Sequence, residues 1–380
     1  MTSIRLSLFF AAYFMIVGVQ LPFWPVWLQS RGMSAAEIGF LLAAATWLKI
    51  ANPLIAGLVD RSGERKRPII ALAVLALGAA GLFMLPGGFW YLLGVSAFFA
   101  LAWSTLNPLA DSLTMMTSQQ QNLDYGRIRL WGSVTFVLAA VGGGRWLAGR
   151  SEDWILWLIL GGLVLTVLAA LALPDSRVVH RPARRPKVGK LLRAPSFLLF
   201  LGAAALTQAS HVVLYGFGTI HWRTLGLSDD VIGLLWAEGV IAEIILFAYS
   251  AWVLKKIGPV GLLIVAAAAG ALRWAVMPLT SDIYVLLLLQ PLHGATFGAA
   301  HLGAIHFIAR AAPLELSATA QSLYSSLALG IAFGIAMPLA GVLYGTLGAL
   351  AYAAMSVMCL AGLGLALVLW RHWDGDVIST

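Results

Sequence analysis

Residues 154–173, WILWLILGGLVLTVLAALAL, form a stretch of twenty residues without a charged side chain. A helix of that length spans the hydrocarbon core of a bilayer, because each residue adds about 1.5 Å across a core about 30 Å thick. Together with this run, apolar runs of similar length centre near residues 16, 48, 78, 100, 138, 164, 207, 242, 269, 295, 331 and 358. The sequence therefore predicts an all-α membrane protein with twelve transmembrane helices.

The composition agrees with a lipid environment. Hydrophobic residues make up 61% of the chain and charged residues 11%, whereas soluble domains carry about a quarter charged residues. The net charge of +8 lies in short loops between apolar runs, so it indicates no nucleic-acid partner. The single cysteine, Cys359, excludes a disulfide framework. The first apolar run continues into LPFWPVW at residues 21–27 without a small-residue cleavage site, so we expect an uncleaved first helix.

Loop charges predict the orientation. If both termini are cytoplasmic, eighteen of the 24 lysines and arginines face the cytoplasm. The basic residues left on the outside are Arg31, Arg145, Arg150 and Arg223. This asymmetry predicts a multi-pass protein of the cytoplasmic (inner) membrane with both termini cytoplasmic.

A hydrophilic stretch divides the chain in the middle. Residues 175–194, rich in proline and basic side chains, are expected to be a cytoplasmic linker between an N-terminal six-helix bundle, 1–174, and a C-terminal six-helix bundle, 195–380. A shift of 194 positions aligns Gly32, Ser34, Ile38 and Gly39 with Gly226, Ser228, Ile232 and Gly233. Two pseudo-symmetric halves of this kind are typical of transporters, because symmetric bundles can rock about a site between them.

The loop after the second helix carries the first resemblance. Its sequence, DRSGERK at residues 60–66, is similar to the signature loop of the major facilitator superfamily, D-[RK]-x-G-x-[RK]-[RK]. The family's glycine four residues before the aspartate is Ala56 here. The resemblance implies a cytoplasmic gate motif formed by Asp60, Arg61, Gly63, Arg65 and Lys66. A loop that only sets the topology is the alternative.

A finer resemblance runs through the rest of the chain. The segment DYGRIRLWGS at residues 124–133 is similar to the start of the fifth helix in lactose-permease-like symporters. Asp111 precedes Arg129 by eighteen residues, and Arg273 precedes His293 by twenty, as in that family. The sugar symporters have a carboxylate where this chain has Thr296, so their proton site does not transfer. With LPFW at 21–24 and YGF at 215–217, the whole chain resembles the phenylpropionate permease branch.

That resemblance implies proton-coupled symport of a small aromatic carboxylate. We expect Arg129, Asp111 and Arg273 to bind the substrate, although a structural ion pair would also explain Asp111 and Arg129. Among the aromatic residues of the cavity helices, Trp24, Trp27 and Tyr215 are further candidates for substrate binding. An interfacial belt of aromatic residues is the alternative for them.

Proton coupling is expected at ionisable groups inside the membrane. The shift of 194 places Lys49 on Glu243, so opposite charges fall at similar depth in the two halves. An apolar setting and a movable counter-charge would let Glu243 load and release a proton, with His293 and His301 as further candidates; a static ion pair is the alternative. The histidines do not converge on one helix face, so neither a metal nor a cofactor is expected.

Other classes of membrane protein have sequence requirements of their own. An enzyme would need a nucleophile, base and orienting group on shared helix faces, and the sequence offers no such set. A channel would show a ring of charged or carbonyl groups and would usually oligomerise, whereas we expect a monomer. Among carriers, a sugar or nucleoside proton symporter and then a drug exporter are the alternatives.

Overall fold

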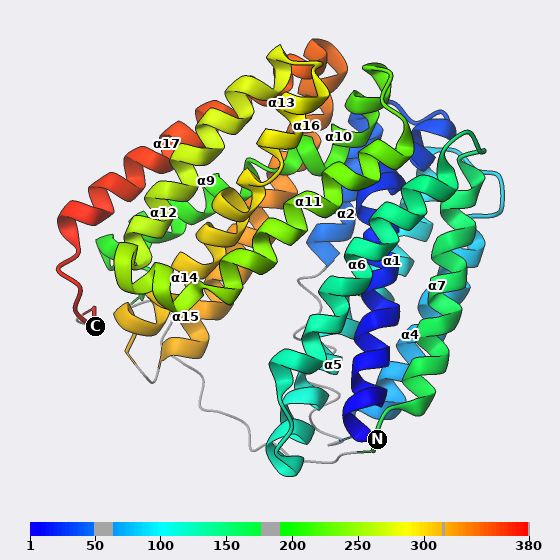
Figure 1. Ribbon diagram of the computed structural model, residues 1–380, viewed down its shortest axis with the longest axis horizontal. Helices are drawn as coiled ribbons and strands as arrows, with labels where there is room; N and C mark the ends of the chain where they lie inside the picture. The colour runs from blue at the N-terminus through cyan, green and yellow to red at the C-terminus, as the bar shows by residue number, and fades with distance from the viewer. Residues whose placement is uncertain (49–63, 176–190, 314–315, 379–380) are drawn as a thin grey trace. The chain divides into compact units, whose positions relative to one another are not determined.

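The computed structural model describes residues 1–48, 64–175, 191–313 and 316–378 of the chain (Figure 1). These residues form two compact units. Unit 1 comprises Met1–Pro182 and Trp222–Ala237, and unit 2 comprises Ala183–His221 and Glu238–Thr380. The predicted gate residues Asp60, Arg61 and Gly63, and the predicted coupling residue Lys49, lie outside the described residues.

Unit 1 is a bundle of long apolar helices. They are α1 (Thr2–Ser30), α2 (Ala35–Trp47), α4 (Lys66–Leu82), α5 (Phe89–Gln121), α6 (Tyr125–Leu147) and α7 (Asp153–Ala172). Helix α1 packs against α6 and α7, while α4 packs against α5 and α7 (Figure 1). The core of this unit is apolar and aromatic, and polar side chains are a minority of its buried residues.

Unit 2 contains the second set of helices. These are α9 (Pro195–Ala209), α10 (Val212–Thr224), α11 (Asp229–Ala248), α12 (Ser250–Val276), α13 (Ile283–Leu289), α14 (Ala299–Ala311), α15 (Ser317–Tyr324), α16 (Phe333–Leu347) and α17 (Ala351–His372), with α10 and α11 shared between the units. Helix α12 packs against α14 and α17, and α17 packs against α9. Two π-helical segments, η3 (Gly294–Gly298) and η5 (Ser325–Ala332), interrupt the regular helices.

Helix lengths fit a membrane. Eight stretches of the described residues are long and apolar enough to cross one. The last of them, Thr319–His372, is broken at η6 (Gly348–Leu350), where Gly348 has a φ of +57°, so it makes two passes. Those nine passes, with α2, α4 and α6 added, give the twelve that the sequence predicts.

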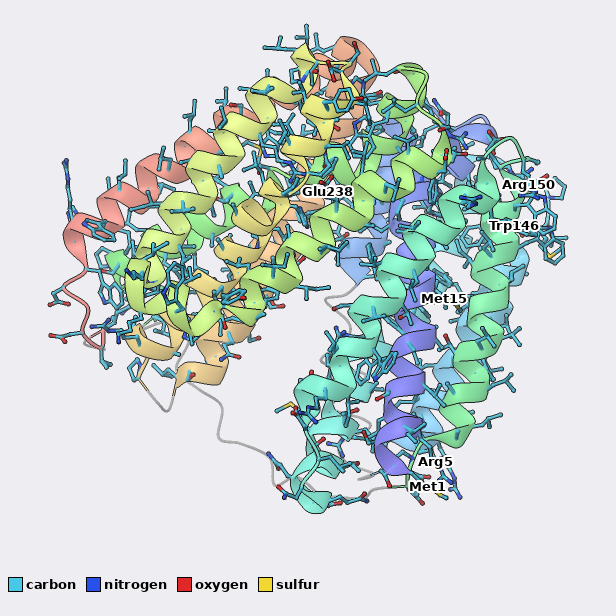
Figure 2. All side chains as sticks on the ribbon, in the orientation of Figure 1. Met1, Arg5, Met15, Trp146, Arg150 and Glu238 are labelled. Carbon is cyan, nitrogen blue, oxygen red and sulfur yellow. The ribbon has the colours of Figure 1, made fainter. Side chains whose placement is uncertain are left out.

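The surface of each unit is apolar between its ends. In unit 1 the exposed fractions of Leu138 and Leu168 are 65% and 56%, which requires lipid rather than water as the neighbour. Charged side chains gather at the ends of the unit. Figure 2 shows Arg5 at one end of unit 1, Met15 midway, and Arg150 at the other end, where its guanidinium stacks on Trp146 at 4.2 Å.

The internal repeat is visible in two turns. Gly32 has a φ of +80° and Gly226 a φ of +81°, which is left-handed backbone that glycine adopts without steric cost. The Gly32 amide donates to Gln29 O at 2.9 Å, and the Gly226 amide donates to Arg223 O at 3.0 Å. The aligned glycines thus close the same turn in both halves of the chain.

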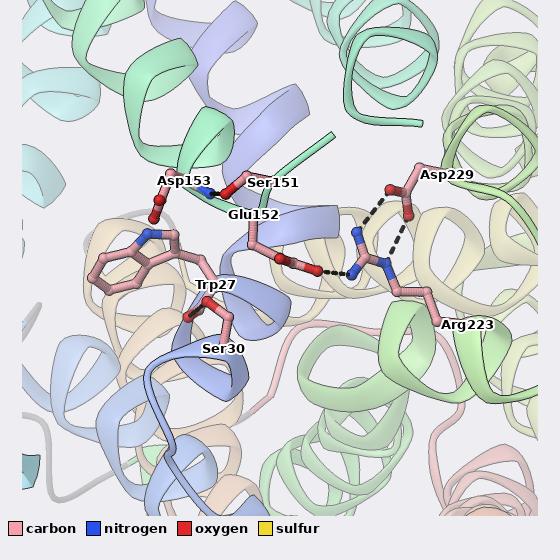
Figure 3. Close-up of polar contacts among 7 residues, drawn as sticks. All are labelled: Trp27, Ser30, Ser151, Glu152, Asp153, Arg223 and Asp229. Carbon is pink, nitrogen blue, oxygen red and sulfur yellow. Dashed lines mark hydrogen bonds and ion pairs between the residues drawn. The ribbon is translucent and has the colours of Figure 1, made fainter. Parts of the chain in front are cut away.

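An arginine with two carboxylate partners lies at one end of unit 1 (Figure 3). The Arg223 guanidinium donates to both oxygens of Asp229, at 2.8 and 2.7 Å, and to Glu152 Oε1 at 2.9 Å. The pKa of the Glu152 carboxyl is lowered, because its own backbone amide and then Arg223 favour the charged form over the opposing effect of burial. This cluster ties the segment Trp222–Ala237 to the start of α7.

Candidate functional site

In unit 1, the two charged residues eighteen positions apart lie together. Asp111 on α5 and Arg129 on α6 form an ion pair with 3.5 Å between Oδ1 and Nε. The carboxylate also accepts hydrogen bonds from the Tyr125 hydroxyl at 2.9 Å and the Asn107 amide at 3.1 Å, and the guanidinium lies 4.1 Å from the Phe14 ring centroid. The charge of each group is therefore neutralised inside the unit.

In unit 2, Arg273 on α12 is only 1% exposed. Its Nη2 donates to Gln290 Oε1 at 2.8 Å, and its Nη1 lies 3.4 Å from both His293 Nδ1 and Thr296 Oγ1. Its guanidinium also faces the Trp274 ring at 4.7 Å. Among the residues that the structure describes, no carboxylate lies within ion-pair distance of Arg273, and its Nε has no partner. Within the described structure, the groups that contact this buried cation are an amide, an imidazole, a hydroxyl and an indole ring.

His293 connects Arg273 to Glu243. Arginine can only donate, so the His293 Nδ1 that faces it acts as the acceptor and the ring proton is assigned to Nε2. That nitrogen lies 3.8 Å from Glu243 Oε2, on α11. A Cβ added to Gly294 would meet the Ala242 carbonyl oxygen at 2.8 Å, so this glycine is what permits α11 to lie so close. His293 therefore lies between the Arg273 guanidinium and the Glu243 carboxyl group.

A second histidine of this cluster was not among the sequence predictions. His211 is fully buried, with Nδ1 3.1 Å from Gln208 O and Nε2 3.0 Å from Thr296 Oγ1. A carbonyl only accepts, so the proton is assigned to Nδ1, and Thr296 donates to Nε2. A histidine in the apolar run near residue 207 was the available signal, because a buried polar group needs partners on neighbouring helices.

Helix irregularities meet at this cluster. His211 lies in the break between α9 and α10, and Thr296 and Phe297 belong to the π-helical segment η3. Such segments often mark functional sites, since they free backbone groups and redirect side chains. Phe297 stacks on His293 at 5.3 Å and on His301 at 6.4 Å between centroids. An aromatic column therefore runs along this helix from His293 to His301.

The remaining predicted residues have varied surroundings. Tyr215 lies at the cluster, with its ring centroid 5.8 Å from that of His211 and 6.3 Å from that of His293. Trp24 and Trp27 are 7% and 0% exposed and stack on each other at 4.5 Å in the core of unit 1. Their surroundings are those of packing residues.

The described part of the gate motif comprises Arg65 and Lys66. Arg65 is 1% exposed and its Nε donates to Ser112 Oγ on α5 at 3.0 Å, while Lys66 begins α4. Arg65 therefore connects the start of α4 to α5 by a hydrogen bond. Among the described residues, no group of three or more His, Cys, Asp or Glu side chains is placed to hold a metal ion.

Twelve membrane passes, irregular helices and ionisable groups buried between them define a multi-pass membrane transporter. The family model of the MFS_1 like family matches residues 3–354. The chain belongs to this family of the major facilitator superfamily, and it is a transporter rather than an enzyme.

Relatives and solved structures agree on the fold. The chain is 33% identical over 369 residues to the probable 3-phenylpropionic acid transporter of Escherichia coli (strain K12), covering 95% of this chain and 96% of the relative. It is 26% identical over 332 residues to the maltose permease of Geobacillus stearothermophilus, covering 85% and 83%. The crystal structure of the nucleoside transporter NupG matches with a TM-score of 0.78 at 16% identity, covering 97% of this chain and 98% of that one. The all-α, twelve-helix prediction is confirmed.

Proposed function

We propose that this chain is a proton-coupled symporter that carries a small aromatic carboxylate, of the 3-phenylpropionate kind, by alternating access. It would lie in the cytoplasmic (inner) membrane with both termini in the cytoplasm. Similarity to the Escherichia coli transporter over nearly the full length supports this substrate class. Relatives that include sugar permeases make a neutral sugar the competing substrate.

The surroundings of Arg273 carry the proposal. A buried charge without a counter-ion costs several kcal/mol, so proteins normally pair it. Arg273 has amide, hydroxyl and imidazole partners and no described carboxylate. A carboxylate substrate would supply the missing anion to the planar guanidinium. Arg129 already has Asp111, so we assign the main carboxylate contact to Arg273 and a positioning role to the Asp111–Arg129 pair.

Proton coupling is assigned to Glu243 with His293 beside it. Glu243 lies between Ala242 and Ile244, and the exposed fraction of its side chain is 20%. When a substrate carboxylate reaches Arg273, a second negative charge nearby becomes less favourable, which promotes protonation of Glu243. Proton and substrate would then travel together. His301 lies one aromatic ring beyond His293 and is a candidate for a further relay step.

Transport into liposomes tests this proposal. Purified protein should accumulate labelled 3-phenylpropionate when an inward proton gradient is imposed. Glu243→Gln should abolish accumulation while exchange of internal for external substrate continues, because exchange needs no net proton release. Glu238→Gln, on the same helix, is the matched control and should accumulate normally. Full accumulation by Glu243→Gln would move the coupling site to Asp111.

Competition for uptake tests the substrate class, and antibody labelling tests the orientation in the membrane. Unlabelled aromatic acids should compete for uptake, and full competition by neutral sugars but not by aromatic acids would overturn the substrate assignment. A tag fused after Thr380 should be inaccessible to antibody in intact cells and accessible after permeabilisation. Access in intact cells would overturn the orientation.

A further inference from the structure

A second polar group of unit 2 lies beside the Arg273 cluster and has no role in binding the carboxylate. Gln208 on α9 is 1% exposed, and its Nε2 lies 3.5 Å from the Tyr324 hydroxyl at the end of α15. Its Oε1 has no partner within the described structure. Turning the amide over would leave the nitrogen unpartnered instead, so one buried amide atom is unsatisfied in either orientation.

The neighbours of Gln208 share this feature. His301 lies with its ring centroid 6.3 Å from that of Tyr324, and its Nδ1 is also buried without a partner in the part of the chain described. Tyr324 therefore contacts two side chains that each have an unused hydrogen-bonding atom. Buried polar groups are nearly always satisfied, because an unmade hydrogen bond lowers stability. The three residues together form a site with unused hydrogen-bonding capacity.

Gln208, Tyr324 and His301 lie at a defined distance from Arg273, the proposed contact for the substrate carboxylate. His293 contacts Arg273, and His301 follows it by eight residues, a rise of about 12 Å along the helix. Phe297 stacks against both histidines, so an aromatic surface lies between the two polar ends. A substrate with a carboxylate, a short chain and a benzene ring matches this order of charged, apolar and polar contacts.

The chemistry of Gln208, Tyr324 and His301 selects the group that would bind there. All three side chains are neutral donors or acceptors, and the described residues around them provide no counter-ion for a second carboxylate or an ammonium. A group that both donates and accepts satisfies the amide in either orientation. A hydroxyl has this property and adds only one heavy atom to the ring.

We infer that Gln208, with Tyr324 and His301, binds a hydroxyl group on the aromatic ring of the substrate, so that hydroxylated phenylpropionates are preferred over the unsubstituted acid. The inference rests on the proposed function and refines its substrate class. A site built to bond a hydroxyl disfavours the analogue that lacks it, because its own polar groups are then left unpaired. Gln208 is accordingly a specificity residue.

Uptake of three acids by the full-length protein tests the inference. Liposomes are supplied with 3-phenylpropionate, 3-(3-hydroxyphenyl)propionate or 3-(4-hydroxyphenyl)propionate, and uptake efficiency is compared. Wild type should favour one hydroxylated acid by about 10- to 100-fold. Gln208→Met keeps the length of the side chain and should reduce that preference to about twofold or less, with uptake of the unsubstituted acid retained.

Two further variants keep the test decisive. Tyr324→Phe retains the ring and should reduce the preference partly, and Gln321→Met, an exposed site on α15, is the matched control that should behave as wild type. Equal uptake of all three acids by wild type, or an unchanged preference in Gln208→Met, overturns the hydroxyl site and leaves the proposed function standing. Failure of wild type to take up any of the acids overturns both.

Discussion

Two arginines inside the helix bundles, one in each unit, have opposite electrostatic surroundings. Arg129 in unit 1 has a carboxylate at 3.5 Å, and that carboxylate has two further donors. Arg273 in unit 2 is more deeply buried and is held by an amide, a hydroxyl and an imidazole. The charge of Arg129 is therefore balanced by a carboxylate, whereas Arg273 has no anionic partner among the described residues.

The difference separates a structural charge from a binding charge. A paired arginine offers little to a ligand, because the ligand must compete with the existing carboxylate. An arginine without a counter-ion retains most of its attraction for an anion, at a cost to the stability of the empty protein. Binding and stability should therefore respond differently to mutation of the two residues.

The largest effect is expected on ligand binding at Arg273. Arg273→Gln should weaken binding of 3-phenylpropionate by about 10- to 100-fold or more, because charge-assisted hydrogen bonds to the carboxylate are lost. Arg273→Lys should retain part of the affinity, since it keeps the charge but not the planar fork. Calorimetric titration of purified protein measures the change. Arg129→Lys should weaken binding less than Arg273→Lys does, because the Arg129 guanidinium is already paired with Asp111.

A smaller effect of opposite sign is expected on stability without ligand. Arg273→Gln removes a buried charge that has no described counter-ion, so its melting temperature should equal or exceed that of wild type. Arg129→Gln leaves Asp111 without its cation and should lower the melting temperature by several degrees. The double variant Asp111→Asn with Arg129→Gln should recover part of that loss. A marked loss of stability in Arg273→Gln would show that the residue serves the fold.

Much of the fold was predictable because lipid imposes it. Apolar runs long enough to span a bilayer leave little choice but helices, and the glycine of a left-handed turn recurs at the same place in both halves. The spacings between Asp111 and Arg129 and between Arg273 and His293 correspond to real contacts. Ionisable side chains are rare in apolar runs, so each one is a strong signal.

The neutral members of the site were harder to predict. Gln208 and Gln290 lie in apolar runs without a pattern that sets them apart, and their importance depends on which side chains of other helices face them. The π-helical segments also leave no periodic signal. For Trp24 and Trp27, the sequence could not predict the stacked and buried arrangement, because aromatic residues that pack in a core and those that face a cavity have the same helical spacing.

The smallest effect on stability is expected at a third arginine, Arg223. Arg223 has two carboxylate partners, so it is still paired after one is removed. Glu152→Gln should therefore lower stability only slightly, because partly exposed ion pairs contribute about 0–1 kcal/mol. Its contribution should also depend on pH. The pKa of Glu152 is lowered in the folded protein, so its stabilisation is present above the ordinary value of 4.5 and is lost as the pH falls below it.

Melting curves of wild type and Glu152→Gln from pH 7 to below pH 4 measure this dependence. The gap between the two melting temperatures should be small at pH 7, should narrow once the pH falls below 4.5, and should close only when the pH has passed the lowered pKa of Glu152, because the folded wild-type carboxyl is then protonated and resembles glutamine. Asp229→Asn is the companion variant, and it should lower the melting temperature more, since Asp229 accepts two hydrogen bonds from Arg223 and its side chain is only 8% exposed. If Glu152→Gln were the more damaging of the two, Arg223 would depend on Glu152 for its pairing. In that case, the number of carboxylate partners would not predict how strongly an arginine depends on each of them, because Arg223 has two such partners.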